Sequence, residues 1–370
     1  MIDQKNKIPI KGYATFHPLK HCMVGSGFKI EWFENIIKEK KILDPLKRIA
    51  EETEEDYLKL IDILKQANVT VHRPELDMSK YKSLYDIRRP PMTPRDHFAV
   101  IGERIYAHGH SEGYWNILKQ IDKRNIVIDP TGNPSYKDFV TTARITRIGK
   151  DIIWGHWSKY GNPKKYVDIM KNDGFNVHMM DADYHHDGCW CVIKPGCIIS
   201  LYDIQNYEKN FPGWDVLYLP DQSYDKIVPF QKLKNKIHKV HGGVGGKWWL
   251  KGEEHNDQLI EFIETWLNDW VGYVEETVFD INLLSLDENH IIGNYNKDVE
   301  TYLKKHNVEL IPFNFRHRYF WDGGIHCITQ DLYREGTMED YGLPSIMTDH
   351  SNDPEKGEYV IEEPGGGFRG

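Results

Sequence analysis

Residues 98–130 read FAVIGERIYAHGHSEGYWNILKQIDKRNIVIDP, and this stretch contains one full copy of a unit that returns along the chain. It begins with two apolar runs on either side of a polar turn, a pattern typical of a β-hairpin. A helical run and a third apolar run follow, so the stretch predicts two antiparallel strands, a helix and a further strand. The fold prediction depends on how often this ββαβ unit recurs.

The hairpin half of the unit recurs at a regular spacing. Its turn glycines, Gly102, Gly149 and Gly196, lie 47 residues apart, and a fourth turn near Asn289 lies close to two periods further on. A fixed period of this length marks a repeated supersecondary unit. The four apolar hairpins occupy residues 98–107, 145–154, 191–200 and 282–293.

The second half of the unit, a helix followed by a short strand, is present five times. A fifth hairpin would pair Lys20–Gly25 with the strand after Cys327 and so join the two ends of the chain. These repeats predict an α/β fold, a five-bladed α/β propeller with pseudo-fivefold ββαβ modules around a central active site. Closure into a ring would cover the edges of the sheets. The alternative to a propeller is an ordinary α/β protein, in which βαβ segments also look alike. The helix–strand copies begin at Ile63, Ile117, Ile169, Tyr207 and Tyr302.

The repeats divide the chain into three parts. Residues 1–12 are polar and are predicted to form a flexible N-terminus, and residues 13–345 a single α/β-propeller domain. Residues 346–370 are rich in glycine, proline and acidic residues, which predicts an extended or disordered C-terminal tail.

Composition excludes several functional classes. The 370 residues are 40% hydrophobic and 28% charged, which is ordinary globular usage. A net charge of −9 argues against a basic surface that would bind nucleic acid or an anionic membrane. No apolar run could span a bilayer, and the N-terminus lacks the apolar core of a secretory signal. Five cysteines form an odd, sparse set, which argues against a disulfide framework and predicts a cytoplasmic location.

The stretch Trp321–Gly336, WDGGIHCITQDLYREG, carries the main candidate for chemistry. Two glycines and a histidine precede Cys327, and glycines let a backbone turn sharply or approach a ligand closely. We therefore predict that Cys327 is a nucleophile presented to a cleft. The alternative is a small buried hydrophobe, the common role of a lone cysteine.

Two other segments hold polar residues at positions that would line the central cavity of a bladed repeat. PRDHF contributes Asp96, and YHHDGCWC contributes His185 and Asp187. Residues two apart on a strand share a face, so His185 and Asp187 are predicted to point into one cavity, with His186 facing away. Two carboxylates suit a planar guanidinium. A thiolate could then attack its carbon while the histidine moves protons between amines.

Each of these residues has a structural alternative. Asp96 could be a turn residue, and either histidine could be a satisfied core or surface side chain. Cys189 and Cys191 beside two histidines offer metal-ligand types, so a metal protein is a further alternative. The C-x-C pair lacks the usual C-x-x-C turn and a second ligand pair, so we expect no metal and no cofactor.

Taken together, the motifs resemble those of amidinotransferases of the arginine:glycine amidinotransferase type, within the pentein superfamily of guanidino-modifying enzymes. The resemblance implies a five-bladed α/β propeller and ping-pong transfer through a covalent amidino-cysteine. It implies that Cys327 is the nucleophile, His185 the general acid/base, and Asp96 and Asp187 the acids that hold the guanidinium. The motifs are FHPLKHCMVGS, MTPRDHFAVIGERI, H-x-D before a P-G hairpin, GG-x-HC and LYREG.

Two departures from the family pattern affect the expected substrates. The family's further catalytic acid falls at Thr141 without a gap, so the resemblance assigns that role to Asp138 through a small insertion. The family's arginine for the substrate carboxylate falls at Ile204 and its serine partner at Asp280. The expectation is an amidino donor, L-arginine, and a primary amine acceptor, with glycine left open and Asp280 favouring an amine-bearing group.

Other functions stay open at this point. A hydrolase of the same superfamily would send the amidino group to water, and a catalytically inactive member would only bind a guanidino compound. The expected partners are a small-molecule donor and acceptor, with no nucleic acid and no membrane. A homodimer is one option for the oligomeric state.

Overall fold

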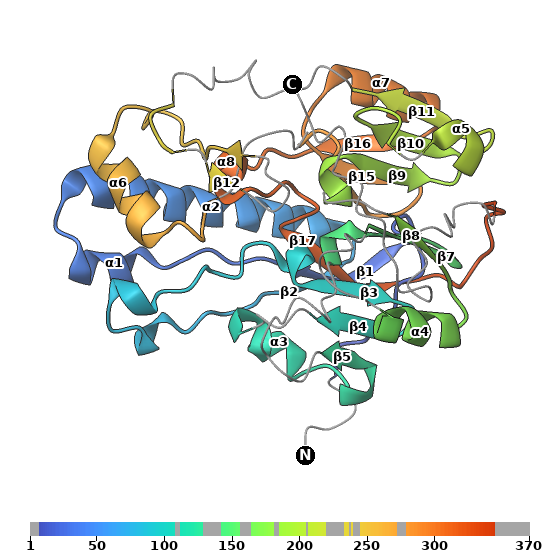
Figure 1. Ribbon diagram of the computed structural model, residues 1–370, viewed down its shortest axis with the longest axis horizontal. Coiled ribbons are helices and arrows are strands. Elements are labelled where there is room, and N and C mark those ends of the chain that lie inside the picture. Colours follow the sequence, from blue (N-terminus) through green and yellow to red (C-terminus); the bar gives the residue numbers. More distant parts are fainter. Residues whose placement is uncertain are drawn as a thin grey trace.

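The computed structural model describes most of the chain as several small β-sheets with helices packed around them (Figure 1). Among the described residues no helix is long and apolar enough to cross a membrane. The description covers residues 7–107, 112–128, 142–155, 164–180, 185–204, 206–219, 233–236, 238–239, 245–271 and 279–344.

Five three-stranded sheets share one topology: the central strand pairs antiparallel with one neighbour and parallel with the other. In the first sheet, β1 (Leu19–Val24) lies between β17 (Thr329–Arg334) and β2 (Thr70–His72). The other four are β3 (Phe98–Ile101), β4 (Arg104–Ala107) and β5 (Ile126–Ile128); β6 (Ile145–Ile148), β7 (Asp151–Gly155) and β8 (Asn176–Met180); β9 (Trp190–Lys194), β10 (Cys197–Ser200) and β11 (Asp215–Tyr218); β14 (Leu284–Ser285), β15 (His290–Gly293) and β16 (Glu309–Pro312). A two-stranded pair joins β12 (His238–Lys239) to β13 (Gly245–Gly246).

The predicted hairpins are confirmed, and so is the pairing of β1 with β17. Gly102, Gly149 and Gly196 have φ angles of 57°, 64° and 88°. Glycine adopts this left-handed conformation without the Cβ clash that other residues meet. The turn glycines were therefore a reliable guide to where each hairpin reverses.

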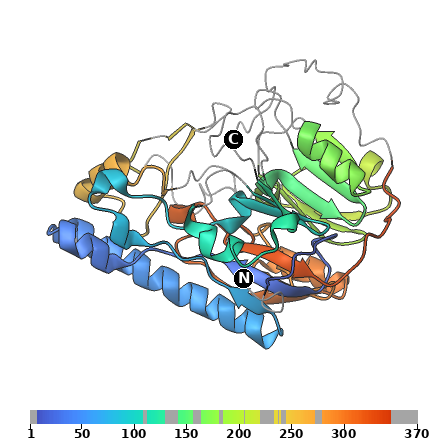
Figure 2. The same cartoon turned by 90° about the horizontal axis from the view of Figure 1, so that it is seen from below.

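Helix α2 (Lys40–Gln66) runs along one edge of the molecule, with α1 (Ile30–Ile36) and α6 (Asp257–Trp266) beside it (Figures 1 and 2). Its buried stripe includes Leu46, Ile49 and Leu60, which are spaced to face the core. The shorter helices are α3 (Trp115–Leu118), α4 (Lys164–Asn172), α5 (Tyr207–Asn210), α7 (Lys297–Lys305) and α8 (Arg318–Trp321).

Helix α2 also anchors two segments that carry candidate site residues. Trp321 Nε1 donates to Thr53 Oγ1 at 3.0 Å, which fixes the end of α8 just before Cys327. Tyr57 donates its hydroxyl to the backbone oxygen of Met92 at 3.0 Å, just before Asp96. Both bonds are buried, where a hydrogen bond is costly to break.

The N-terminal segment differs from expectation. Residues 1–12 are predicted to be flexible, but within the described part, residues 7–12, Ile8 and Ile10 are each only 5% exposed. The backbone N–H of Lys11 donates to the carbonyl of Leu332 at 2.9 Å. Two isoleucines in an otherwise polar stretch are enough to pack it onto the sheets. The expected tail over residues 346–370 lies outside the described residues.

Candidate active site

Cys327 lies in the turn between α8 and β17, and its side chain is buried. The thiol donates to Asp187 Oδ2 at 3.3 Å, and Asn282 Nδ2 donates to the sulfur at 3.1 Å. Gly324 lies against Asn282, because a Cβ on this glycine would be 2.4 Å from Asn282 Oδ1. The glycine therefore makes room for a polar side chain next to the sulfur.

Asp187 lies in a short 3-10 turn, η9 (His186–Gly188), and is buried. Its Oδ2 accepts from His326 Nδ1 at 2.8 Å, whereas Oδ1 has no hydrogen-bond partner among the described residues. Burial acts to raise the pKa of Asp187, but the hydrogen bond from His326 and the charges around it hold this pKa well below its usual range. Asp187 is therefore ionised and has one free acceptor.

Asp96 and His185 form the second half of the cluster. Asp96 ends the 3-10 turn η4 (Pro94–Asp96), and its Oδ1 lies 3.8 Å from His185 Nδ1. Burial raises the pKa of Asp96, and the charge of Asp187 adds to this effect. The side chain of His185 is 52% exposed, so solvent can reach this member of the cluster.

The two acids also act on the sulfur. Burial raises the pKa of the Cys327 thiol well above its ordinary value, and the charges of Asp187 and Asp96 raise it further. Hydrogen bonds from the Gly324 backbone and from Asn282 act in the opposite direction. The balance of these effects favours a neutral thiol beside Asp187 and Asp96. A bound cation would reverse the effect of both acids.

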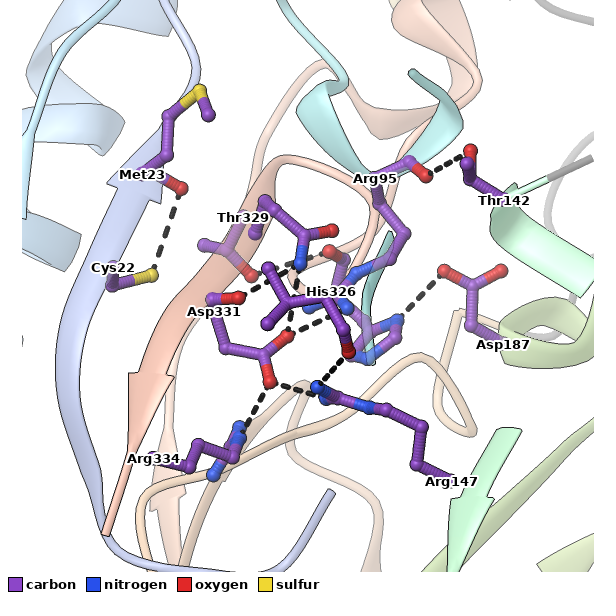
Figure 3. Close-up of polar contacts among 12 residues, drawn as sticks. Cys22, Met23, Arg95, Thr142, Arg147, Asp187, His326, Thr329, Asp331 and Arg334 are labelled. Carbon is purple, nitrogen blue, oxygen red and sulfur yellow. Dashed lines mark hydrogen bonds and ion pairs between the residues drawn. The ribbon is translucent and has the colours of Figure 1, made fainter. Parts of the chain in front are cut away.

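A buried cluster of charges underlies this site (Figure 3). The carboxylate of Asp331 accepts from Arg95 Nη1 at 2.7 Å and from Arg334 Nε at 2.7 Å. Its Oδ2 also accepts a short bond from Arg147 Nη2. All four side chains are less than 8% exposed. The cluster joins η4, β6 and β17, and the backbone N–H of Arg95 donates to the Cys327 carbonyl at 3.3 Å. It therefore holds the segment of Asp96 against the segment of the thiol.

The predicted strand around His185 is not formed. Residues 186–188 make the turn η9, and β9 begins only at Trp190. His186 is buried, and its Nδ1 lies 2.9 Å from Thr146 Oγ1. The prediction that strand alternation aligns His185 with Asp187 is wrong, because a 3-10 turn has about three residues per turn and does not alternate faces.

Acid is expected to destabilise the protein through His186. Burial lowers the pKa of this histidine to about 3, with the charge of Arg144 adding to the effect. Between that value and the ordinary pKa of about 6.5 the unfolded chain binds a proton that the native state does not, so stability falls as pH falls. Urea unfolding from pH 7 to pH 4 should show this slope, and His186→Asn should reduce it. An unchanged slope in the variant would contradict the assignment.

No protein-family model matches the chain. It is 23% identical over 358 residues to the mitochondrial glycine amidinotransferase of Xenopus laevis, covering 81% of this chain and 72% of that protein. It is 22% identical over 207 residues to the L-arginine:L-lysine amidinotransferase of Pseudomonas savastanoi pv. phaseolicola, covering 54% and 45%. The chain resembles amidinotransferases over most of its length. An amidinotransferase from the saxitoxin biosynthetic pathway of Microseira wollei has the same fold, with a TM-score of 0.61, 19% identity, and 90% and 99% of the two chains covered.

The structure thus brings together four of the residues chosen from the sequence: Cys327, His185, Asp96 and Asp187. The structure does not join Asp280 to these four; its Oδ2 accepts from Asn296 Nδ2 at 2.9 Å, which leaves its second oxygen for another contact, and Asn296 caps the start of α7. Asp138 lies outside the described residues.

Asn282, His326 and Arg95 also lie at this site, and the sequence motifs did not point to them. His326 and Arg95 adjoin residues that had been chosen, in the pairs H-C and R-D, which was the available signal. Asn282 gave no such signal, because it precedes a short strand far from Cys327 in the chain. The described ranges contain no group of three or more His, Cys, Asp or Glu side chains arranged to hold a metal ion.

Proposed function

We propose that this protein is an amidinotransferase that moves an amidino group from a guanidino donor, L-arginine, to a primary amine through a covalent amidino-Cys327. The observation that carries the proposal is the contact of a buried thiol with an ionised carboxylate, Asp187, beside a second acid, Asp96. A neutral thiol between two acids is poorly reactive until a cation arrives. A guanidinium brings both the cation and the carbon to be attacked.

Donor binding would use the oxygens that the fold leaves unpaired. Asp187 Oδ1 and Asp96 Oδ1 have no hydrogen-bond partner within the described part of the chain. A planar guanidinium offers five N–H donors and pairs well with carboxylates. Its charge offsets those of the two acids, so the pKa of Cys327 falls when the donor is bound. The thiolate then forms only in the presence of substrate.

The transfer has two balanced halves. His185 takes the Cys327 proton, the thiolate attacks the guanidinium carbon, and His185 gives the proton to the departing amine as the C–N bond breaks. An acceptor amine then attacks the amidino carbon and loses a proton to His185. The C–S bond breaks, and the sulfur regains its proton from the histidine. The exposure of His185 suits this exchange of amines.

The fold proposal extends to the arrangement of the sheets. We infer that the five sheets close into a five-bladed propeller around the site. This is supported by their common topology and by the pairing of β1 with β17. The five cysteines are all unpaired, which supports a reducing compartment such as the cytosol. Asp138 remains our proposed orienting acid for His185, and Asp280 our proposed contact for the acceptor.

The first test is a single-turnover experiment. Protein mixed with L-arginine and quenched in acid should carry an amidino group on the peptide containing Cys327, as read by mass spectrometry. Glycine, L-lysine and other primary amines, added separately, should remove the label and yield a guanidino product. Citrulline or urea formed without any amine would instead select the hydrolase. Binding of arginine without any adduct would select a non-catalytic protein.

A further inference from the structure

The side chain of Asn282 makes four hydrogen bonds and is fully buried. Its Oδ1 accepts from the backbone N–H of His326 at 2.8 Å and of Cys327 at 3.2 Å. Its Nδ2 donates to the backbone oxygen of Asp187 at 2.9 Å and to Cys327 Sγ at 3.1 Å. One amide thus connects the turn of the nucleophile with the turn of the substrate-binding acid.

These partners fix the orientation of the amide. Two backbone N–H groups can only donate, so they require the oxygen of Asn282. The carbonyl of Asp187 can only accept, so it requires the nitrogen. A flipped amide would place N–H against N–H and oxygen against oxygen. The second N–H of Asn282 is therefore directed at the sulfur.

The backbone of Gly324 also affects the sulfur. Its backbone N–H acts with Asn282 to lower the pKa of Cys327, against burial and the two carboxylates. The absence of a Cβ at Gly324 also leaves the space that Asn282 Oδ1 occupies. Gly324 therefore packs against the amide that donates to the sulfur.

We propose that Asn282 is a catalytic residue whose Nδ2–H stabilises the Cys327 thiolate. The proposal rests on the proposed function in taking Cys327 as the nucleophile. Hydrogen bonds to a charged partner are stronger than those to a neutral one. The Nδ2–H of Asn282 therefore favours the thiolate over the thiol. In the same arrangement the two acceptor bonds of Asn282 keep the His326–Cys327 backbone in place.

The decisive variant is Asn282→Asp. It keeps the shape and the oxygen that accepts from His326 and Cys327, and it replaces only the donating nitrogen. Asn282→Ser serves as a second variant that avoids a new buried charge. The matched control is Asn235→Asp, because Asn235 is also buried and donates through Nδ2, but to the backbone oxygen of Trp248 at 2.7 Å. Circular dichroism and thermal unfolding show which variants remain folded.

The readout is the pH profile of Cys327 alkylation by iodoacetamide, followed on its peptide by mass spectrometry. At a fixed pH below the midpoint, both Asn282 variants should react about tenfold or more slowly than the parent, with the midpoint moved to higher pH. The Asn235 variant should keep the parent profile. An unchanged profile in folded Asn282→Ser and Asn282→Asp would overturn the proposal.

Alkylation does not require amidino transfer, so the two proposals can fail separately. A shifted profile in a protein that never forms an adduct with arginine would keep the role of Asn282 in stabilising the thiolate and reject the amidinotransferase. Normal amidino transfer together with an unshifted alkylation profile in the Asn282 variants would support the amidinotransferase. It would reject the role of Asn282 in stabilising the thiolate.

Discussion

Replacing Cys327 by serine is expected to lower the rate of amidino transfer by about 10⁴-fold or more, because removing a nucleophile typically has effects of this size. A serine hydroxyl is a much weaker acid than a thiol and would remain neutral beside Asp187. The variant should still fold, since the side chains are similar in shape and the bond from Asn282 can be kept. The measurement is product formation from arginine and the best acceptor.

The matched control for this variant is Cys191→Ser. Cys191 lies in β9, and burial raises the pKa of its thiol to about 12, so it is not expected to react. This control should retain transfer within a few-fold of the parent. Transfer that persists in Cys327→Ser, or an amidino label on another cysteine, would reject Cys327 as the nucleophile.

Replacing Asp331 by asparagine is expected to lower the free energy of unfolding by about 3–5 kcal/mol, the usual cost of leaving buried charges without their partner. Arg95, Arg147 and Arg334 would lose the carboxylate that they share. Arg95 would suffer most, because its Nε and Nη2 already have no hydrogen-bond partner in the described part of the chain. Urea unfolding at neutral pH measures the loss.

The comparison for Asp331 is Asp173→Asn. Asp173 pairs with Arg104, and both side chains are partly exposed, so the loss should stay below about 1 kcal/mol.

Acid should destabilise the protein through Asp331, in the same direction as the substitution. Burial tends to raise its pKa, but the three arginines hold it well below the usual range. Its stabilising contribution is thus present above about pH 3.9 and is lost as pH falls toward the native pKa. A loss in Asp331→Asn no larger than in Asp173→Asn would contradict this role.

The repeat could be predicted from the sequence because each hairpin carries its own local signal. Apolar runs and a turn glycine lie within ten residues, as at Gly102 and Gly149, and the structure confirms them. The pairing of β1 with β17 was predicted in a different way, by counting units and asking which one lacked a hairpin. It is confirmed although its partners lie at opposite ends of the described chain.

The site was predictable only in part. Cys327, Asp96 and Asp187 stood out because glycines or histidines flank them in short motifs. Asn282 and the arginines around Asp331 could not be found in this way, because their roles arise from contacts between distant segments. His185 was chosen for a reason that the structure does not support, since strand alternation was assumed where the chain forms a 3-10 turn.

The pairing of β1 with β17 has a consequence for synthesis on the ribosome. Residues 19–24 emerge early, but their antiparallel partner at residues 329–334 emerges only after nearly all of the other sheets have been translated. Until then one edge of the first sheet remains open, and contacts of such long range form slowly. The nascent chain must keep this edge from pairing with other strands. Cys327 lies just before this last strand, so its sulfur can meet Asp187 and Asp96 only when translation of the described chain is nearly complete.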